Sequence, residues 1–354
     1  MAYTDLRRGI LLATALYLAF RFIGTVAVTL FLFYTVFLLA MAINPIVTRL
    51  ARRRVPRFAG ALLIALCLLG ILMLFGWLII PPIVDEASDF ARDVPTYWEA
   101  GQAQAQKFIN RFPPLRDRLA RPLPAGQELI GQMSLILTRI GRYTVNIASA
   151  LFAALFVLIM TIYTVAYPQP LLLGLLGALP TTQREQASTA LVRISRQVRA
   201  WIIASLLLGA VVGLADGIGL ALLGVPNALL LAVLAGLGEF IPNFGPVIAA
   251  IPAVFLAFAV SPQTALWVLL LYLVIQQIEN HFLVPFILGS QMELHPLSIA
   301  FFILVMGGTM GVIGTILAVP TAAIVKVLYE EFYYKPRHPD HDAIVRDVER
   351  IVNT

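Results

Sequence analysis

The stretch EFIPNFGPVIAAIP, residues 239–252, breaks a long apolar segment that extends over residues 226–260. Proline removes a backbone donor and clashes with the preceding helical turn, so this segment cannot form one straight helix. In hydrocarbon, the backbone groups that the break frees must be buried in protein or line a cavity. The segment is therefore either a kinked span or a re-entrant hairpin whose tip, residues 240–246, lies within the membrane.

A second broken segment, residues 297–328, carries a similar phrase. The sequence GPVIAAIP at 245–252 corresponds to GTILAVP at 314–320, each with a glycine, small and aliphatic residues and a final proline. Each broken segment follows an unbroken apolar span, so residues 200–330 contain two similar helical units. Broken segments in corresponding positions of two units indicate a transporter binding site. We expect a transport core with two re-entrant helical hairpins in an inverted repeat.

The composition indicates that lipid surrounds most of the chain. Apolar residues make up 60% of its 354 residues and charged residues 12%, against about 45–50% and 25% in ordinary globular proteins. The net charge of +6 fits cytoplasmic loops rich in Lys and Arg, so nucleic acid is not an expected partner. We predict an all-α polytopic membrane protein with about eight membrane segments.

Residues 1–82 are expected to form an N-terminal membrane hairpin and one further span. Residues 9–44 carry a single formal charge and would rise about 54 Å as a helix, too far for one crossing of about 30 Å. Two short helices that turn near Gly24 would fit this length better. An arginine-rich turn follows, and the next span ends at Pro81-Pro82.

The middle of the chain is expected to lie on both sides of the membrane. Residues 83–143 are polar with two helix-length patterns and predict a small helical extracytoplasmic subdomain. Residues 144–199 contain a returning span and then an amphipathic segment, 183–199, in which apolar residues recur at helical spacing among arginines. That pattern suits a helix at the cytoplasmic interface, either an orientation anchor or a moving coupling arm. Residues 331–354 are expected to form a cytoplasmic tail.

The two breaks supply candidate substrate-binding residues. The side chain of Asn243 offers an acceptor and two donors, and a glycine such as Gly245 lets the backbone approach a ligand. The alternative is that the glycines only permit close helix packing. The candidates at the two tips are Pro242, Asn243, Gly245, Pro246, Gly308, Thr309, Gly311 and Gly314.

Three carboxylates lie in these apolar stretches: Asp216, Glu239 and Glu279. Each costs about 2.5–3.5 kcal/mol or more at the bilayer centre, so each needs a partner or a wet cavity. Asp216 lies beside a stripe of glycines at four-residue spacing, which predicts close packing of that face against another helix. Each carboxylate is a candidate for ion or proton coupling, and each could equally be a buried hydrogen-bonding group.

A belt of polar residues crosses the span at residues 264–288. Its members cover about 200° of arc at 100° per residue, so protein or water must surround the helix at this level. The members are Gln276, Gln277, Glu279, Asn280 and His281. All of them except His281 are candidate substrate-binding residues.

The sequence gives no sign of enzyme chemistry. It has four scattered histidines, one cysteine (Cys67), no HExxH motif and no Walker A loop. These features argue against a metal enzyme and against ATP-driven transport within this chain. We therefore expect no cofactor, no metal site and no catalytic residue.

The motif set resembles one family of membrane proteins. The stretches EFIPNFGPVIAAIP (239–252), QQIENHFLVPFILGSQMELHPL (276–297) and GVIGTILAVP (311–320) are similar to the autoinducer-2 exporter family of bacterial permeases. The resemblance implies a homopentamer in the bacterial inner membrane, whose subunits move small molecules by an elevator-like shift. Carried over by position, the two hairpins are residues 228–260 and 298–326. Some members of the family are associated with sodium–proton exchange.

Three functions are open at this point. The first is export of a small polar organic molecule such as autoinducer-2, with the hairpin tips and the polar belt supplying hydrogen bonds. The second is sodium–proton or other cation–proton antiport through one of the three carboxylates. The third is a non-transporting scaffold of the cell envelope, whose subdomain at 83–143 binds a partner. The expected partners are membrane lipid, a small-molecule substrate and further copies of the chain.

The arginine distribution also predicts the topology. Residues 46–57 and 183–199 and both termini are expected to be cytoplasmic, and residues 83–143 extracytoplasmic. A membrane-impermeant thiol reagent applied to intact cells should label single cysteines placed in 83–143 and should not label those in 183–199. Labelling of 183–199 from outside would contradict this topology.

Overall fold

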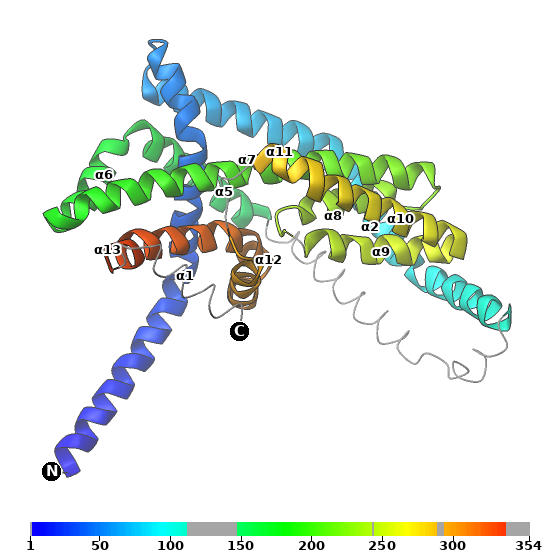
Figure 1. The fold of residues 1–354 in the computed structure, drawn as a ribbon, viewed down its shortest axis with the longest axis horizontal. Coiled ribbons are helices and arrows are strands. Elements are labelled where there is room, and N and C mark those ends of the chain that lie inside the picture. The colour runs from blue at the N-terminus through cyan, green and yellow to red at the C-terminus, as the bar shows by residue number, and fades with distance from the viewer. Residues whose placement is uncertain (1, 112–146, 243, 289–293, 338–354) are drawn as a thin grey trace, which may run out of the picture. The chain divides into compact units, whose positions relative to one another are not determined.

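The computed structural model describes residues 2–111, 147–242, 244–288 and 294–337, and every regular element in those ranges is helical (Figure 1). The all-α prediction is therefore confirmed for this part of the chain. The helices form two compact units. Unit 1 consists of Met1–Leu68 and Asn146–Gly177, and unit 2 consists of Leu69–Val145 and Ala178–Thr354.

Unit 1 has a small core of Ala and Val side chains. Its elements are α1 (Ala2–Arg52), the first part of α2 (Arg57–Arg111), α5 (Ile147–Ala166) and α6 (Pro168–Gly177). The Arg57 guanidinium donates to Asn44 Oδ1 at 2.8 Å and to the Val165 carbonyl oxygen at 3.4 Å. One arginine thus ties the start of α2 to α1 and α5. The buried core residues are Ala40, Val47, Ala61, Val165 and Ala166.

The long helix α1 corrects the predicted N-terminal hairpin. Residues 9–44 lie within one continuous helix of 51 residues, and the chain does not turn at Gly24. A single glycine costs a helix interior only about 1 kcal/mol, and no proline lies within residues 9–44 to add to that cost. The expectation that both ends of this segment lie on one side of the membrane depended on that turn, and a continuous helix does not support it.

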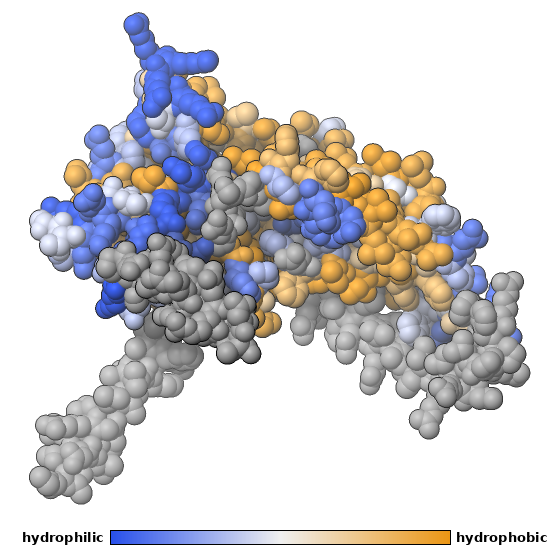
Figure 2. Space-filling model, in the orientation of Figure 1, coloured by the Kyte–Doolittle hydropathy of each residue, from blue (hydrophilic) through white to orange (hydrophobic). Residues whose placement is uncertain are grey.

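Unit 2 contains the rest of α2 and the C-terminal half of the chain. Its further elements are η2 (Thr181–Gln183), α7 (Arg184–Leu222), α8 (Ala228–Gly238), α9 (Gly245–Val260), α10 (Pro262–Ile278), the π-helical turn η3 (Glu279–Leu283), α11 (Val284–Leu288), α12 (Pro296–Tyr329), the π-helical turn η4 (Glu330–Tyr334) and α13 (Lys335–Arg337). Figure 2 shows apolar side chains gathered over the part of the unit formed by α8 to α10. Exposed apolar surface of this kind is expected where lipid is the solvent.

The amphipathic segment 183–199 is helical, as predicted, but it does not form a helix of its own. It continues into the following span, so that α7 is one helix of 39 residues. Ala187, Ile194 and Val198 are buried on its apolar face. The arginine-rich start of α7 is therefore coupled directly to the part of the helix that carries Asp216.

The helix α2 also differs from its predicted form, because it continues past Pro81-Pro82 to Arg111. Proline has a φ angle suited to a helix, and its cost there comes from a lost hydrogen bond and a steric clash. Phe90 and Val94, beyond the prolines, are buried in the core of unit 2. We infer that this packing offsets the cost of the prolines.

The part of α2 beyond the prolines fastens the start of α8. Glu86 Oε2 accepts from the backbone N–H of Leu230 at 2.7 Å, and the Glu86 carbonyl oxygen accepts from Asn227 Nδ2 at 2.6 Å. A carboxylate in the first turn of a helix also suits the helix dipole. Residues 83–111 of α2 are the described part of the predicted subdomain at 83–143, and residues 112–143 lie outside the described residues.

The glycine stripe of α7 packs as predicted. A Cβ atom on Gly209 would lie 2.6 Å from the carbonyl oxygen of Gly236 in α8, and one on Gly213 would lie 3.0 Å from that of Ala232. Backbones this close leave little room for side chains. Asp216, on the same side of α7, is 1% exposed. The prediction that this face of α7 turns into protein is confirmed.

Both predicted breaks are present. Helices α8 and α9 have 11 and 16 residues, about 16 and 24 Å in length, each short of a hydrocarbon core of about 30 Å. The helix α12 is interrupted at Gly311, which has a φ of 65°. The location of these two hairpins within a membrane, and their relation as an inverted repeat, stay predictions.

Gly245 and Gly314, which begin the two similar phrases, have the same role at the two breaks. A Cβ atom on Gly245 would overlap the backbone of Gly238, and one on Gly314 would overlap the carbonyl oxygen of Met306. Each glycine is the point where the second arm of a hairpin contacts the first. Packing between two parts of the chain therefore suffices to explain a glycine at both positions.

The described residues include five helices that are long and apolar enough to cross a membrane. The pair α5 and α6, bent by 78° at residue 167, raises the number to six. These helices support a multi-pass membrane protein, and the total of about eight segments stays a prediction. The five helices lie at Thr29–Arg52, Arg57–Phe90, Thr181–Leu222, Pro262–Ile287 and Pro296–Arg337.

The contact between α7 and α8 generates a stability prediction. Gly209→Val should lower the stability of the purified protein by about 1–3 kcal/mol, because the new side chain must push two backbones apart. Gly174→Val is the matched control, since a Cβ atom at Gly174 in α6 would meet nothing within 4 Å. Thermal unfolding in detergent measures both variants. Equal stability of the two would contradict this packing.

Candidate functional site

Three buried carboxyl groups come together in unit 2. Asp216 lies in the C-terminal part of α7, Glu239 follows α8 at the first break, and Glu279 begins the π-helical turn η3. Their exposed fractions are 1%, 4% and 6%. Three separate elements thus contribute one carboxyl group each to the same interior. We call these three residues the carboxyl cluster.

The groups of the carboxyl cluster interact directly. The carboxyl groups of Glu239 and Glu279 lie within hydrogen-bonding reach of each other, and Asp216 is close enough to interact electrostatically with both. An ionised carboxylate has only acceptors, so a hydrogen bond between two carboxyl groups requires a proton on one of them. Gln276 Nε2 donates to Glu279 Oε2 at 2.8 Å and orients that group. A proton bound between Glu239 and Glu279 would satisfy this requirement.

Tyr272 also belongs to this site, although it is not among the candidate residues predicted from the sequence. It is 8% exposed, its hydroxyl group has no hydrogen-bond partner in the described part of the chain, and it interacts electrostatically with Asp216. Tyr272, Gln276 and Glu279 are spaced by four and three residues, which places them on one face of a helix. This spacing is the signal in the sequence that could have identified Tyr272.

The described residues give the carboxyl cluster no positive partner. None of the ion pairs found within the described ranges includes it, and Asp216 Oδ1 and Glu239 Oε1 are buried without a hydrogen-bond partner. Three ionised groups in an apolar interior would repel one another and would have lost their hydration. Protons or a cation must neutralise part of this charge. The site is therefore suited to bind and release positive charge.

A fourth buried glutamate, Glu331, provides the contrast. It is 5% exposed and forms ion pairs with Arg193 and Lys335, as buried charged residues normally do. Protonation of Glu331 would break these ion pairs. The carboxyl cluster can change its protonation without breaking any, which is what an ion-coupling site requires.

The structure describes the candidate residues of the first break only in part. Gly245 and Pro246 are buried at the start of α9, and Pro242 is half-buried. Gly245 lies against the backbone of Gly238. Asn243 lies outside the described residues, so its role in substrate binding stays a prediction.

The second break has a more open surface. Gly308, Thr309 and Gly311 are exposed, whereas Gly314 is buried. A Cβ atom on Gly308 or Gly311 would meet nothing within 4 Å. The Thr309 hydroxyl donates to the carbonyl oxygen of Val305 at 2.9 Å, a common arrangement within helices. The open backbone at this tip is compatible with a substrate-lining role, which stays a prediction.

The polar belt divides between the protein interior and the exposed surface. Glu279 is buried and Gln276 is half-buried, whereas Gln277, Asn280 and His281 are exposed. The π-helical geometry of η3 changes the rotation per residue, so the 100° assumed for an α-helix does not apply throughout the belt. Protein surrounds the buried half, and the surroundings of the exposed half stay a prediction.

Comparison with known proteins supports the family resemblance. A family profile described as AI-2E family transporter matches residues 10–334, nearly the whole chain. The AI-2 transport protein TqsA of Escherichia coli (strain K12) is 25% identical over 296 residues, which cover 83% of this chain and 83% of that protein.

Two proteins of Bacillus subtilis (strain 168) are also similar. The one named "Putative transport protein YueF" is 26% identical over 294 residues, 81% of this chain and 79% of that protein. The similarly named YrrI is 33% identical over 153 residues, 43% of this chain and 43% of that protein. All of these relatives are named for transport and none for an enzymatic reaction.

The contrast between Glu239 and Glu331 generates a prediction on stability. Glu239→Gln should raise the stability near neutral pH by about 1 kcal/mol, because an amide can donate to Glu279 without a shared proton and removes one source of repulsion. Glu331→Gln should lower the stability, because it removes the ion-pair partner of Lys335 and one of the two partners of Arg193. Thermal unfolding of both purified variants is the measurement. A loss of stability in Glu239→Gln as large as that in Glu331→Gln would contradict the unpaired state of the cluster.

Proposed function

The chain belongs to the AI-2E transporter family, and we propose that it is a secondary transporter in which the carboxyl cluster couples solute movement to protons. The observation that carries this proposal is the meeting of Asp216, Glu239 and Glu279 in one apolar interior, with no positive partner in the part of the chain that the structure describes. Ionisable groups inside a membrane protein commonly mark proton relays and ion pathways. A transporter without an ATP-binding motif can use such a group to take energy from an ion gradient.

The closeness of the Glu239 and Glu279 carboxyl groups suggests how protons would act. With a proton bound, the pair carries less charge and is compatible with apolar surroundings. After release of the proton, repulsion within the cluster favours a state in which water reaches it. A ligand shifts such an equilibrium only by its difference in affinity for the two states. Because Glu239 directly follows α8, its change of charge would act on the first hairpin.

We propose that the hairpins α8–α9 and α12 move in an elevator-like step. The contacts of Gly245 with Gly238 and of Gly314 with Met306 hold the two arms of each hairpin together. Each hairpin would therefore move as one body and not as two separate helices. A homopentameric assembly in the bacterial inner membrane is proposed from the family resemblance.

The proposed solute is a small polar organic molecule that is exported from the cell. The name of the relative TqsA assigns autoinducer-2 to that protein, and a molecule of this class is the proposal here. The exposed polar groups available to it are the side chains of Gln277, Asn280 and Thr309 and the open backbone at Gly308 and Gly311.

Cation–proton exchange is the second candidate function. The buried oxygens Asp216 Oδ1 and Glu239 Oε1 have no donor among the described residues, so a monovalent cation could bind there in competition with protons. In this case the movement of protons would depend on the cation gradient and would not require an organic solute.

Reconstituted vesicles with a pH-sensitive dye inside test the proposal. Addition of the organic solute should move protons in the parent protein, and Glu239→Gln should reduce that movement to background because it removes a titrating group. Glu279→Gln should also lose proton movement, yet assemble and retain part of the solute flux. Glu99→Gln, an exposed glutamate on α2, is the matched control and should behave as the parent.

Each outcome of this assay has a defined meaning. Proton movement that follows a sodium gradient without organic solute would favour the exchanger. Undiminished proton movement in both cluster variants would contradict the proposed coupling site. Loss of function in the Glu99→Gln control would show that the assay responds to any change of charge.

A further inference from the structure

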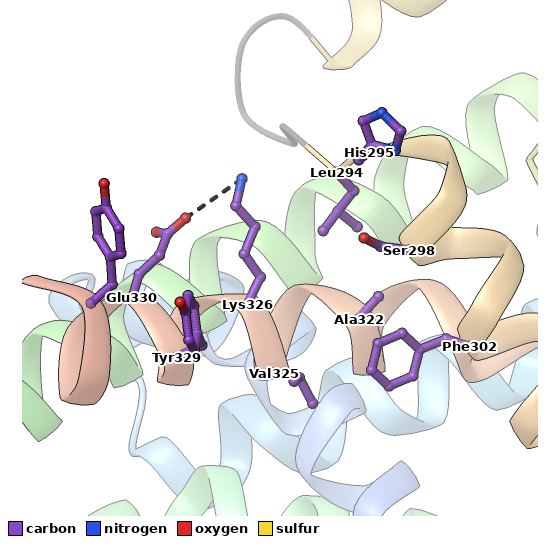
Figure 3. A pocket seen from close by; sticks show the side chains of 10 residues that line it. Leu294, His295, Ser298, Phe302, Ala322, Val325, Lys326, Tyr329 and Glu330 are labelled. Carbon is purple, nitrogen blue, oxygen red and sulfur yellow. Dashed lines mark ion pairs between the residues drawn. The ribbon is translucent and has the colours of Figure 1, made fainter. Parts of the chain in front are cut away.

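A pocket of about 510 Å³ lies between the two arms of α12. Ser298 and Phe302 line it from the first arm, and Ala322, Val325 and Lys326 line it from the second (Figure 3). Residues 302 and 322 would lie about 30 Å apart in a straight helix. The bend at Gly311 therefore creates this pocket by bringing distant parts of α12 together.

The pocket combines an apolar wall with polar groups at its rim. Phe302, Ala322 and Val325 supply apolar surface. Lys326 and Glu330 project from the same side of the second arm, and Lys326 Nζ lies 3.6 Å from Glu330 Oε1 (Figure 3). The rim thus combines the positive charge of Lys326 with the hydroxyl groups of Ser298 and Tyr329.

The charges around this rim are positive in sum. Glu330 and Glu331 are the two carboxylates of the network, and Arg193 binds both of them. Lys326 and Lys335 form the further ion pairs. Three cations thus face two carboxylates, so the network has a net charge of +1. Arg337 lies nearby, 4.0 Å above the ring of Tyr333.

Aromatic side chains gather at the same end of α12. They indicate that this end lies at the interface between membrane and water. Tyr329 and Tyr333 are stacked with ring centroids 5.4 Å apart, and Tyr334 lies 6.3 Å from Tyr329. Tyrosine is enriched at the level of lipid headgroups, where its ring is in apolar surroundings and its hydroxyl reaches water. The pocket rim therefore lies where a headgroup is expected.

The first arm of α12 also offers a surface for a lipid chain. Leu297, Phe301 and Leu304 are 73%, 59% and 76% exposed. Their spacing of four and three residues places them on one face of the arm, next to the pocket-lining Ser298 and Phe302. A molecule whose polar end occupies the rim could therefore lay its chain along this face.

We propose that the α12 pocket binds the phosphate-bearing headgroup of an anionic phospholipid. Lys326 binds the phosphate, the tyrosine and serine hydroxyls at the rim add hydrogen bonds, and the acyl chain follows the exposed face of the first arm. Basic pockets between membrane helices are suited to anionic lipid headgroups. Because the pocket lies between the two arms of α12, the bound lipid stabilises one arrangement of this hairpin. This inference does not depend on the proposed function.

Lipid-dependent stability of the full-length protein in detergent tests this site. Short-chain phosphatidylglycerol should raise the unfolding temperature more than phosphatidylcholine with the same chains, because a ligand stabilises the state that binds it. Lys326→Gln should weaken the apparent affinity for phosphatidylglycerol about fivefold, which corresponds to about 1 kcal/mol per basic residue near a headgroup. Ser298→Phe, which fills the pocket from an exposed position, should abolish the extra stabilisation.

The controls separate the pocket from general charge effects. Lys335→Gln removes a lysine of the same network that does not line the pocket, and it should retain the full response to phosphatidylglycerol. A response equal to that of the parent in both Lys326→Gln and Ser298→Phe would overturn the proposal. An equal loss in Lys335→Gln and Lys326→Gln would do so too. Inorganic phosphate alone should give no stabilisation, and full protection by it would assign the pocket to a soluble phosphorylated ligand instead.

Discussion

Charge inside an apolar interior must be neutralised, and unit 2 meets this constraint in two ways. At one end of α7, Arg193 forms ion pairs with Glu330 and Glu331. Twenty-three residues further on, about 35 Å along the same helix, Asp216 joins Glu239 and Glu279 with no cationic side chain from the described ranges. The first arrangement is stable in a fixed protonation state, while the second requires protons or a cation from outside. This difference is the physical basis for proposing a structural role for the first arrangement and ion coupling for the second.

The sequence predicts those features of the fold that depend on local chemistry. Proline and glycine at residues 242–246 and around Gly311 indicate the two breaks, because these residues act on the backbone where they stand. Prediction from the sequence fails where packing between distant segments outweighs local signals. Pro81 and Pro82 suggest a helix end, yet α2 continues because Phe90 beyond them is buried in a core formed by other helices. Length alone suggested a turn near Gly24, and nothing in the local sequence imposes one.

The candidate site likewise combines features that the local sequence predicts with features that depend on packing between distant segments. Asp216, Glu239 and Glu279 are recognisable one by one as charges in apolar stretches, and the glycine stripe correctly places Asp216 in the interior. Their meeting depends on how α7, α8 and α10 pack together, which no local pattern specifies. Tyr272 looks like an ordinary core aromatic until its position relative to the cluster is known. Gly245 is the opposite case. The sequence allowed a ligand contact at this position, but the packing of Gly245 against Gly238 is enough to explain the glycine.

Infrared difference spectroscopy of the purified protein tests the central claim most directly, because a protonated carboxyl group has a carbonyl stretch that an ionised one lacks. The account predicts that raising the pH removes such a band in the parent protein, as the proton shared by Glu239 and Glu279 is lost. The same band should be absent or displaced in Glu239→Gln and unchanged in Glu331→Gln. A parent spectrum without a protonated carboxyl band at any pH, or an identical band in Glu239→Gln, would contradict a proton-binding carboxyl cluster.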